Sequence, residues 1–266
     1  MIPLRDSANT ANAIETARNA GFDAGNKGNV AGFSTDRVLA NYRDWAQQAE
    51  RLLGNVFTRD AVDDLVRTQR FWTLQSATGE EPLLISMVLA ELAERRQAME
   101  DLVTQLCKVH ARWCQAGFDS IAVADTNMFL RAEAPFEEVD WLGTVGGSAL
   151  RLVLPIAVVH ELDRLKRQGN NTTQSMARQS LRWLYQNLPR DPAGRTGELA
   201  AAPGVTVEVF VHDGPTRSPD VDALTIDVAR WLGIVSDVPV KLVTRDLGMR
   251  LRAQTIGVHA VQLPDD

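Results

Sequence analysis

Two periodicities of apolar residues divide the chain. Between residues 35 and 116 apolar positions recur every three or four residues, which predicts helices. Beyond Gly117, short apolar runs alternate with helical stretches, and these runs are SIAVADT, RLVLP, VTVEVFV, VPVKLVT and VHAVQL. The intervening helices are expected to begin near Phe136, Ile156, Thr172, Asp220 and Asp246. Strands that alternate with helices of this length pair in parallel through right-handed crossovers. Residues 118–266 are therefore predicted to form an α/β three-layer sandwich with a mostly parallel sheet.

The helical region, residues 35–116, has its clearest pattern on its last helix, which should start near residues 80–82. Apolar residues recur there every seven positions, at Ile85, Leu92, Met99, Leu106 and Trp113. Such a stripe packs against other helices, either in the same chain or in a second copy. Arg95 and Arg96 interrupt the heptad pattern. We therefore favour an intramolecular three-helix unit, with self-association or a protein partner as the alternative.

Residues 1–34 follow neither pattern. They are rich in Ala, Asn and Gly, and AGFDAGNKGNVAGFSTD closes the stretch. Apart from a short helix around residues 11–19, this composition predicts a flexible N-terminal arm. The sequence thus indicates an arm (1–34), an all-α helical domain of unknown role (35–116) and an α/β domain (118–266).

Composition excludes several classes of protein. The 266 residues are 45% hydrophobic and 23% charged, which is typical of a globular protein with buried cores. No run of about 20 apolar residues could cross a bilayer, and no signal peptide is recognisable, so we expect no membrane association and a cytoplasmic location. Cys107 and Cys114 are too few and wrongly spaced for a zinc site. The net charge of −6 argues against non-specific coating of nucleic acid, but not against an enzyme that acts on it.

Candidate chemistry gathers at one edge of the predicted sheet. Ligands of an open parallel sheet bind beyond the carboxyl ends of its strands. Four acids are expected there, namely Asp125, Glu161, Asp222 and Asp246. A cluster of unpaired carboxylates repels itself. Mg²⁺ or Mn²⁺ would relieve this repulsion because both ions prefer oxygen ligands, and no Cys or His shares these positions to favour a softer metal.

The acids also have a structural interpretation. Three of them could cap helices, at Asp125, Asp222 and Asp246. Glu161 is not a cap residue, yet it is expected at the same edge, which favours a shared site. On its helix Asp163 lies about 200° away and has an ion-pair partner four residues on, in Arg167. Glu161 is therefore assigned to the site and Asp163 to the solvated face.

Four segments in the C-terminal half carry a family resemblance: VADTNMFL, LRLVLPIAVVHELDRLKR, SPDVDALTIDVARWL and VPVKLVTRDLGMRLRAQTIGV. In this order, over about residues 118–264, they resemble the PIN domain, a superfamily of metal-dependent nucleases. The resemblance implies an acidic cleft that binds Mg²⁺ or Mn²⁺ and cleaves RNA endonucleolytically. It places catalytic, metal-binding acids at Asp125, Glu161, Asp222 and Asp246. Asp220 competes with Asp222 for the third position.

The resemblance also implies supporting residues. Thr126 and Asn127 match a hydroxyl and an amide that brace the first acid, and Thr244 matches a Thr beside the fourth. For the phosphates of a nucleic acid, closeness in sequence to the first two acids favours Arg131 and Lys166. The four histidines show no partner pattern and are interpreted as structural.

The predicted function is a metal-dependent endoribonuclease with an acidic two-metal-type site. Two alternatives remain: the toxin of a toxin–antitoxin pair, and a non-catalytic PIN-like module recruited through the helical half. Compact PIN toxins consist of little beyond the domain itself, whereas this chain has a helical half that shows no family resemblance.

Overall fold

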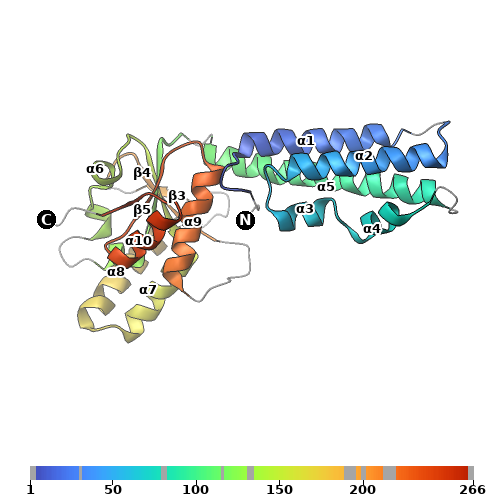
Figure 1. The fold of residues 1–266 in the computed structure, drawn as a ribbon. Coiled ribbons are helices and arrows are strands. Elements are labelled where there is room, and N and C mark those ends of the chain that lie inside the picture. Colours follow the sequence, from blue (N-terminus) through green and yellow to red (C-terminus); the bar gives the residue numbers. More distant parts are fainter. Residues whose placement is uncertain are drawn as a thin grey trace. The chain divides into compact units, whose positions relative to one another are not determined.

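The computed structural model describes residues 4–29, 32–78, 83–114, 117–130, 135–188, 196–198, 202–211 and 220–262. The chain forms two compact units, a helical unit (residues 2–115) and an α/β unit (residues 116–266) (Figure 1). No helix in the described ranges is both long and apolar enough to traverse a lipid bilayer.

The helical unit is built on three long helices that lie side by side, joined by two short ones (Figure 1). The helices are α1 (Thr10–Lys27), α2 (Thr35–Leu53), α3 (Arg59–Leu65), α4 (Gln69–Ser76) and α5 (Leu84–Cys114). The seven-residue stripe on α5 is buried at four of its five positions, Leu92, Met99, Leu106 and Trp113. Helices α1 and α2 contact α5 within the unit, so this chain itself supplies a cover for the stripe.

Helix α1 includes the short helix expected around residues 11–19 and continues to Lys27, so the prediction of a flexible arm is wrong for residues 20–27. The Asn9 side chain caps α1 by accepting the Asn12 N–H. One face of the helix is buried at Ala13, Ala17, Ala20 and Ala24. A Cβ added at Gly21 would lie 2.9 Å from the Cβ of Met99 on α5. The Ala and Gly content therefore reflects close helix packing, a tertiary effect that local composition does not reveal.

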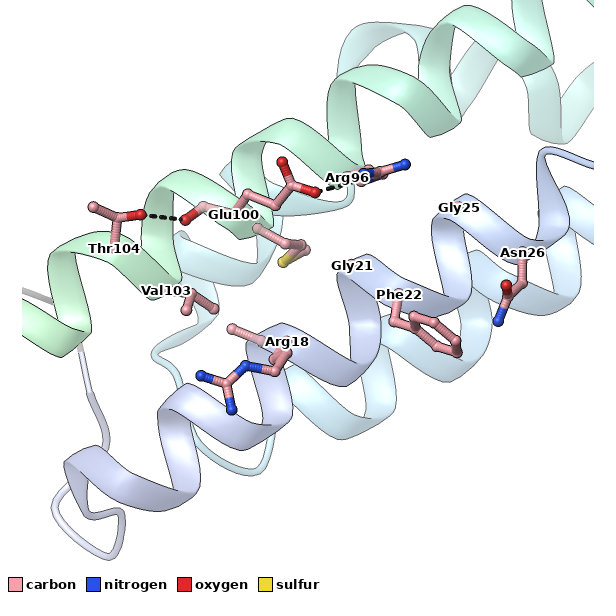
Figure 2. A pocket seen from close by; sticks show the side chains of 11 residues that line it. Arg18, Gly21, Phe22, Gly25, Asn26, Arg96, Glu100, Val103 and Thr104 are labelled. Atoms are coloured by element: carbon pink, nitrogen blue, oxygen red, sulfur yellow. Dashed lines mark hydrogen bonds and ion pairs between the residues drawn. The ribbon is translucent and has the colours of Figure 1, made fainter.

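A groove of about 600 Å³ follows α1 and α5 past Gly21 and Gly25 (Figure 2). Phe22 lines it from α1 and is 69% exposed. On the α5 side, Arg96 Nε donates to Glu100 Oε1 at 2.8 Å (Figure 2). This groove belongs to the helical unit and contains none of the four candidate acids.

The α/β unit contains a six-stranded sheet in the order β3-β4-β2-β1-β5-β6. The strands are β1 (Ser120–Ala124), β2 (Leu150–Pro155), β3 (Thr196–Glu198), β4 (Val205–Phe210), β5 (Val240–Val243) and β6 (Ala260–Val261). Five of them pair in parallel, and β3 pairs antiparallel to β4 at the edge. The predicted three-layer α/β fold with a mostly parallel sheet is confirmed. Strand β3 is not among the predicted apolar runs, because its three residues, TGE, carry no apolar alternation.

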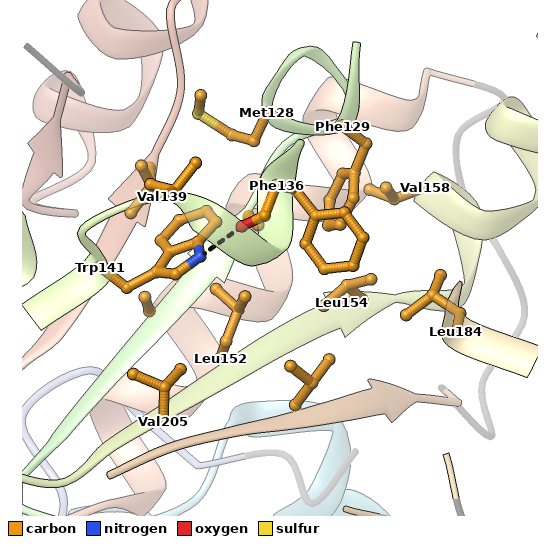
Figure 3. Packing of buried hydrophobic residues seen from close by; sticks show 14 of the residues in the cluster. Met128, Phe129, Phe136, Val139, Trp141, Leu152, Leu154, Val158, Leu184 and Val205 are labelled. Atoms are coloured by element: carbon orange, nitrogen blue, oxygen red, sulfur yellow. Dashed lines mark hydrogen bonds between the residues drawn. The ribbon is translucent and has the colours of Figure 1, made fainter. Parts of the chain in front are cut away.

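Helices flank this sheet. They are η1 (Thr126–Phe129), η2 (Phe136–Glu138), α6 (Trp141–Val145), α7 (Ile156–Gln168), α8 (Asn171–Asn187), α9 (Val221–Val235) and α10 (Leu247–Thr255). A buried cluster joins β1, β2 and β4 to α6, α7 and α8 (Figure 3). Within it, Trp141 Nε1 donates to the Phe136 carbonyl at 2.9 Å. Outside this cluster, Trp231 of α9 stacks on Phe210 of β4, with ring centroids 5.4 Å apart.

The register of β1 and β5 brings the first site residues together. Ala124 of β1 pairs with Val243 of β5, so the residues that follow, Asp125 and Thr244, leave the sheet side by side. The Asp125 N–H extends the ladder by donating to the Val243 carbonyl at 3.1 Å.

Candidate metal centre

Asp125 is a buried acid, with 1% of its surface exposed. Its Oδ1 accepts the N–H of Thr126 at 2.6 Å. Its Oδ2 accepts the Asn127 amide at 3.1 Å and the Thr244 hydroxyl at 2.8 Å. Asp125 thus caps η1, as the structural interpretation requires, but none of these donors carries a positive charge.

Glu161 projects from the second turn of α7 toward the same residues. The Thr126 hydroxyl donates to Glu161 Oε2 at 2.7 Å. Thr126 therefore connects two acids, because its backbone N–H binds Asp125 while its side chain binds Glu161. The other oxygen, Oε1, accepts from Arg164 Nη2 at 3.2 Å, one helical turn further along.

The start of α9 carries the third acid position. Asp220 caps α9 by accepting the N–H of Asp222 at 3.0 Å. Both carboxylates pair with Arg252 of α10, at 3.0 Å for Asp220 and 2.5 Å for Asp222. Burial raises the pKa of Asp125, and the negative charge of Asp222 adds to that shift. This electrostatic coupling favours Asp222 over Asp220 as the acid that faces Asp125.

Asp246 caps α10, its Oδ1 accepting the Met249 N–H at 2.9 Å. Its own N–H donates to the Thr244 hydroxyl at 3.1 Å, and that hydroxyl donates to Asp125. Thr244 therefore links the first and fourth acids. Capping uses only one carboxylate oxygen, so the cap and the site are compatible interpretations of Asp246.

The electrostatics of Asp125 fit a bound cation. Burial is the largest influence and raises its pKa. The hydrogen bonds from Thr244 and Thr126 oppose the rise, whereas the charges of Asp222 and Glu161 increase it. A buried carboxylate beside other carboxylates is stabilised by an ion of opposite charge. All the candidate ligand atoms are oxygens, which suits hard ions such as Mg²⁺ or Mn²⁺.

The four candidate acids do not converge on a single point in this structure. Among the described residues, no three of the four acids bring ligand oxygens within 4.8 Å of one another. Glu161 binds Arg164, and Asp222 binds Arg252. Closer approach of these two carboxylates to Asp125 would require them to exchange their arginine partners for another cation.

The two predicted phosphate contacts have different outcomes. Arg131 lies outside the described residues. Lys166 forms an ion pair with Asp163, on a helix face about 140° from Glu161. Asp163 also binds Arg167 at 2.6 Å, as the spacing predicted.

Two arginines were missed as partners of the acids. Arg164 could have been found from its three-residue spacing to Glu161. The partners of Arg252 lie 30 and 32 residues before it in the sequence, so no local pattern indicates them.

A PIN domain family model matches residues 122–264, which is more than half of the chain. The chain belongs to the PIN domain family. The match runs from within β1 to beyond β6 and includes all four candidate acids, so the resemblance seen in the sequence is confirmed. PIN domains are typically metal-dependent nucleases. The match does not extend into the helical unit, which remains without a recognised relative.

Other comparisons add little to this assignment of the PIN domain. No curated protein matches the chain. Among solved structures, the chain is similar to a domain of a functionally unknown protein from Methanocaldococcus jannaschii DSM 2661. The two are 19% identical, with 55% of this chain and 92% of that chain covered and a TM-score of 0.37.

Proposed function

We propose that this PIN domain is a Mg²⁺- or Mn²⁺-dependent endoribonuclease. One observation supports the proposal above the others: Asp125 is buried among neutral donors and acidic neighbours. A buried carboxylate with a purely structural role would be expected to pair with a cation of the chain itself. Membership of a family of nucleases gives this charge pattern its chemical interpretation.

The proposed ligands are Asp125, Glu161 and Asp246, with Asp222 holding a second ion or orienting the attacking water. A divalent cation at these residues would supply positive charge to the developing phosphoryl oxygens and acidify the attacking water.

The neighbouring residues fix the geometry of the acids. Thr244 and Asn127 hold the Asp125 carboxylate from one side, and Thr126 holds Glu161. Arg164 is exposed beside Glu161, which makes it a better candidate than Lys166 for contacting a substrate phosphate. Arg131 stays a candidate on its sequence position alone.

The test is cleavage of pooled transcripts by the wild type and by Asp125→Asn, with Mn²⁺ or Mg²⁺ present and the cut sites mapped. We expect the substitution to lower the cleavage rate at least about 100-fold, because metal-assisted charge stabilisation contributes several kcal/mol. Asp163→Asn is the matched control. It removes a carboxylate from α7 that pairs with Lys166 and Arg167 rather than with the site, so its cuts should match those of the wild type.

The outcomes separate the candidate functions. Equal cuts from the wild type and Asp125→Asn would contradict the site. Cleavage of single-stranded DNA but not RNA would support nuclease activity and contradict RNA as the substrate. A wild type that binds RNA and cuts nothing with either ion would favour the non-catalytic module. Growth arrest on expression, abolished by Asp125→Asn, would indicate a toxin.

A further inference from the structure

Arg252 joins two acids at the edge of the candidate site. It lies in the last turn of α10, the helix whose start is capped by Asp246. Its Nη1 donates to Asp220 at 3.0 Å and its Nη2 to Asp222 at 2.5 Å. The guanidinium fork thus binds two separate carboxylates at the start of α9, each through one nitrogen, and a fixed planar fork suits such a bridge.

We propose that Arg252 is an internal counter-ion that competes with the divalent cation for Asp222. Before an ion binds, Arg252 pairs with Asp222, whose negative charge also acts on Asp125. When an ion binds, Asp222 exchanges the guanidinium for it, and Asp220 retains Arg252. This inference rests on the proposed function, and it assigns different roles to two acids that the sequence could not separate: Asp222 is the ligand and Asp220 the holder of the arginine.

A comparison with the other arginine at the site supports the choice of Arg252. Arg164 binds Glu161 from the same helix, three residues away, and its side chain is 58% exposed. Such pairs within a helix are weak. Arg252 instead connects two helices and engages two carboxylates, so its removal should affect ion binding more than removal of a partner of Glu161 alone.

The shared arginine also explains how the exchange can occur without leaving a charge unpaired. Asp220 and Asp222 are both partly exposed, as is Arg252. If Asp222 turns toward Asp125, Arg252 still has Asp220 as a partner. Without Asp220, the same movement would leave the guanidinium without either of these carboxylates, which would oppose ion binding.

The experiment is isothermal titration of the full-length, chelator-treated protein with MnCl₂. We expect Arg252→Gln to tighten Mn²⁺ binding by about two- to five-fold, the range that corresponds to losing a competing exposed ion pair. Arg178→Gln is the control for net charge. Arg178 is exposed on α8 and donates to Gln174 and to the Lys166 carbonyl, so its loss should leave Mn²⁺ affinity nearly unchanged.

A double-mutant cycle tests the role of Asp220. Asp220→Asn should weaken Mn²⁺ binding in the wild-type background, and the weakening should be smaller in the Arg252→Gln background, because the arginine it holds is gone. Circular dichroism verifies that each variant is folded.

The results distinguish this inference from the proposed function. If the wild type binds no Mn²⁺, the proposed metal site fails and this inference fails with it. If the wild type binds Mn²⁺ but Arg252→Gln binds equally or more weakly, only the competition is overturned. Equal effects of Arg252→Gln and Arg178→Gln would mean that the change in affinity reflects long-range charge alone. This outcome would also overturn the proposed competition.

Discussion

Two almost completely buried carboxylates, Glu91 in the helical unit and Asp125 in the α/β unit, are held in opposite ways. Glu91 on α5 and Asp125 after β1 are both 1% exposed. Glu91 accepts a hydrogen bond from Thr68 at 2.8 Å and forms ion pairs with Arg70 at 3.1 Å and Arg95 at 3.3 Å. Among the described residues, the groups that donate to Asp125 are neutral, and the charges that act on it come from other acids.

Under the proposed function, this difference distinguishes a structural carboxylate from a functional one. A buried charge is tolerated when the fold supplies its partner, and removal of that partner is strongly destabilising. The helical unit supplies two arginines to Glu91. Among the residues described, the α/β unit supplies none to Asp125, and under the proposed function a bound metal ion supplies the compensating charge. Burial alone would not have distinguished these two residues.

The largest effect is expected at Glu91. Glu91→Gln keeps the size of the side chain but removes the buried counter-charge of Arg95 and Arg70, which retain the exposed Glu94 as a partner. We expect the free energy of unfolding to fall by about 3 kcal/mol, measured by urea denaturation. Glu94→Gln is the matched control, because Glu94 also binds Arg70 but is 54% exposed. Its loss should be under about 1 kcal/mol. Equal losses of stability for the two variants would contradict the interpretation of Glu91 as a structural buried carboxylate.

An intermediate effect is expected at Thr244, which supports the other carboxylate. Burial raises the pKa of Asp125, and the Thr244 hydroxyl bond opposes that rise. Thr244→Val removes this donor and the acceptor of the Asp246 N–H. We expect the free energy of unfolding of the metal-free protein to fall by about 1–3 kcal/mol. The pKa of Asp125 should rise further, so that Mn²⁺ binding weakens at mildly acidic pH.

Thr225→Val provides the comparison for Thr244→Val. Thr225 is equally buried, on α9, and its hydroxyl donates to the Val221 carbonyl one turn earlier in the same helix. The same substitution there should cost less stability and leave the pH dependence of Mn²⁺ binding unchanged. If both threonines behaved alike, Thr244 would have no special role at the site.

The sequence predicted the order of strands and helices along the chain, and the parallel pairing of the strands, because apolar runs of strand length are separated by helical patterns. It also predicted that Asp125, Glu161, Asp222 and Asp246 share one edge of the sheet, since that follows from parallel topology. It could not predict α1, whose Ala and Gly residues become a packing face only against α5. Nor could it assign Arg252 or Lys166, because the partner of a long, flexible side chain depends on tertiary geometry and on which neighbouring acid is closest.

The smallest effect is expected at Asp119. This exposed acid allows the influence of hydrogen bonds on a carboxyl pKa to be compared with that of burial. Like Asp125, it has only neutral donors. The Ser148 N–H and hydroxyl and the Ala149 N–H lower its pKa to about 2, with a further contribution from the Ser120 hydroxyl. Donors of the same kind thus accompany opposite pKa shifts, because Asp125 is buried beside other acids and Asp119 is not. Burial and the neighbouring acids, rather than its hydrogen bonds, are what set Asp125 apart.

Asp119→Asn tests this separation through the pH dependence of thermal unfolding. A pKa that is lower in the folded state means that ionised Asp119 stabilises the fold above its unfolded pKa of about 3.9. That stabilisation is lost as the pH falls through about 2. The variant should therefore melt below the wild type at pH 7, and the two melting temperatures should converge near pH 2. For Asp125, whose pKa is raised, the sign reverses, and ionisation destabilises the metal-free fold as the pH rises. A melting difference at Asp119 that did not shrink in acid would mean that its hydrogen bonds act independently of its charge, and the contrast with Asp125 would then lose its electrostatic basis.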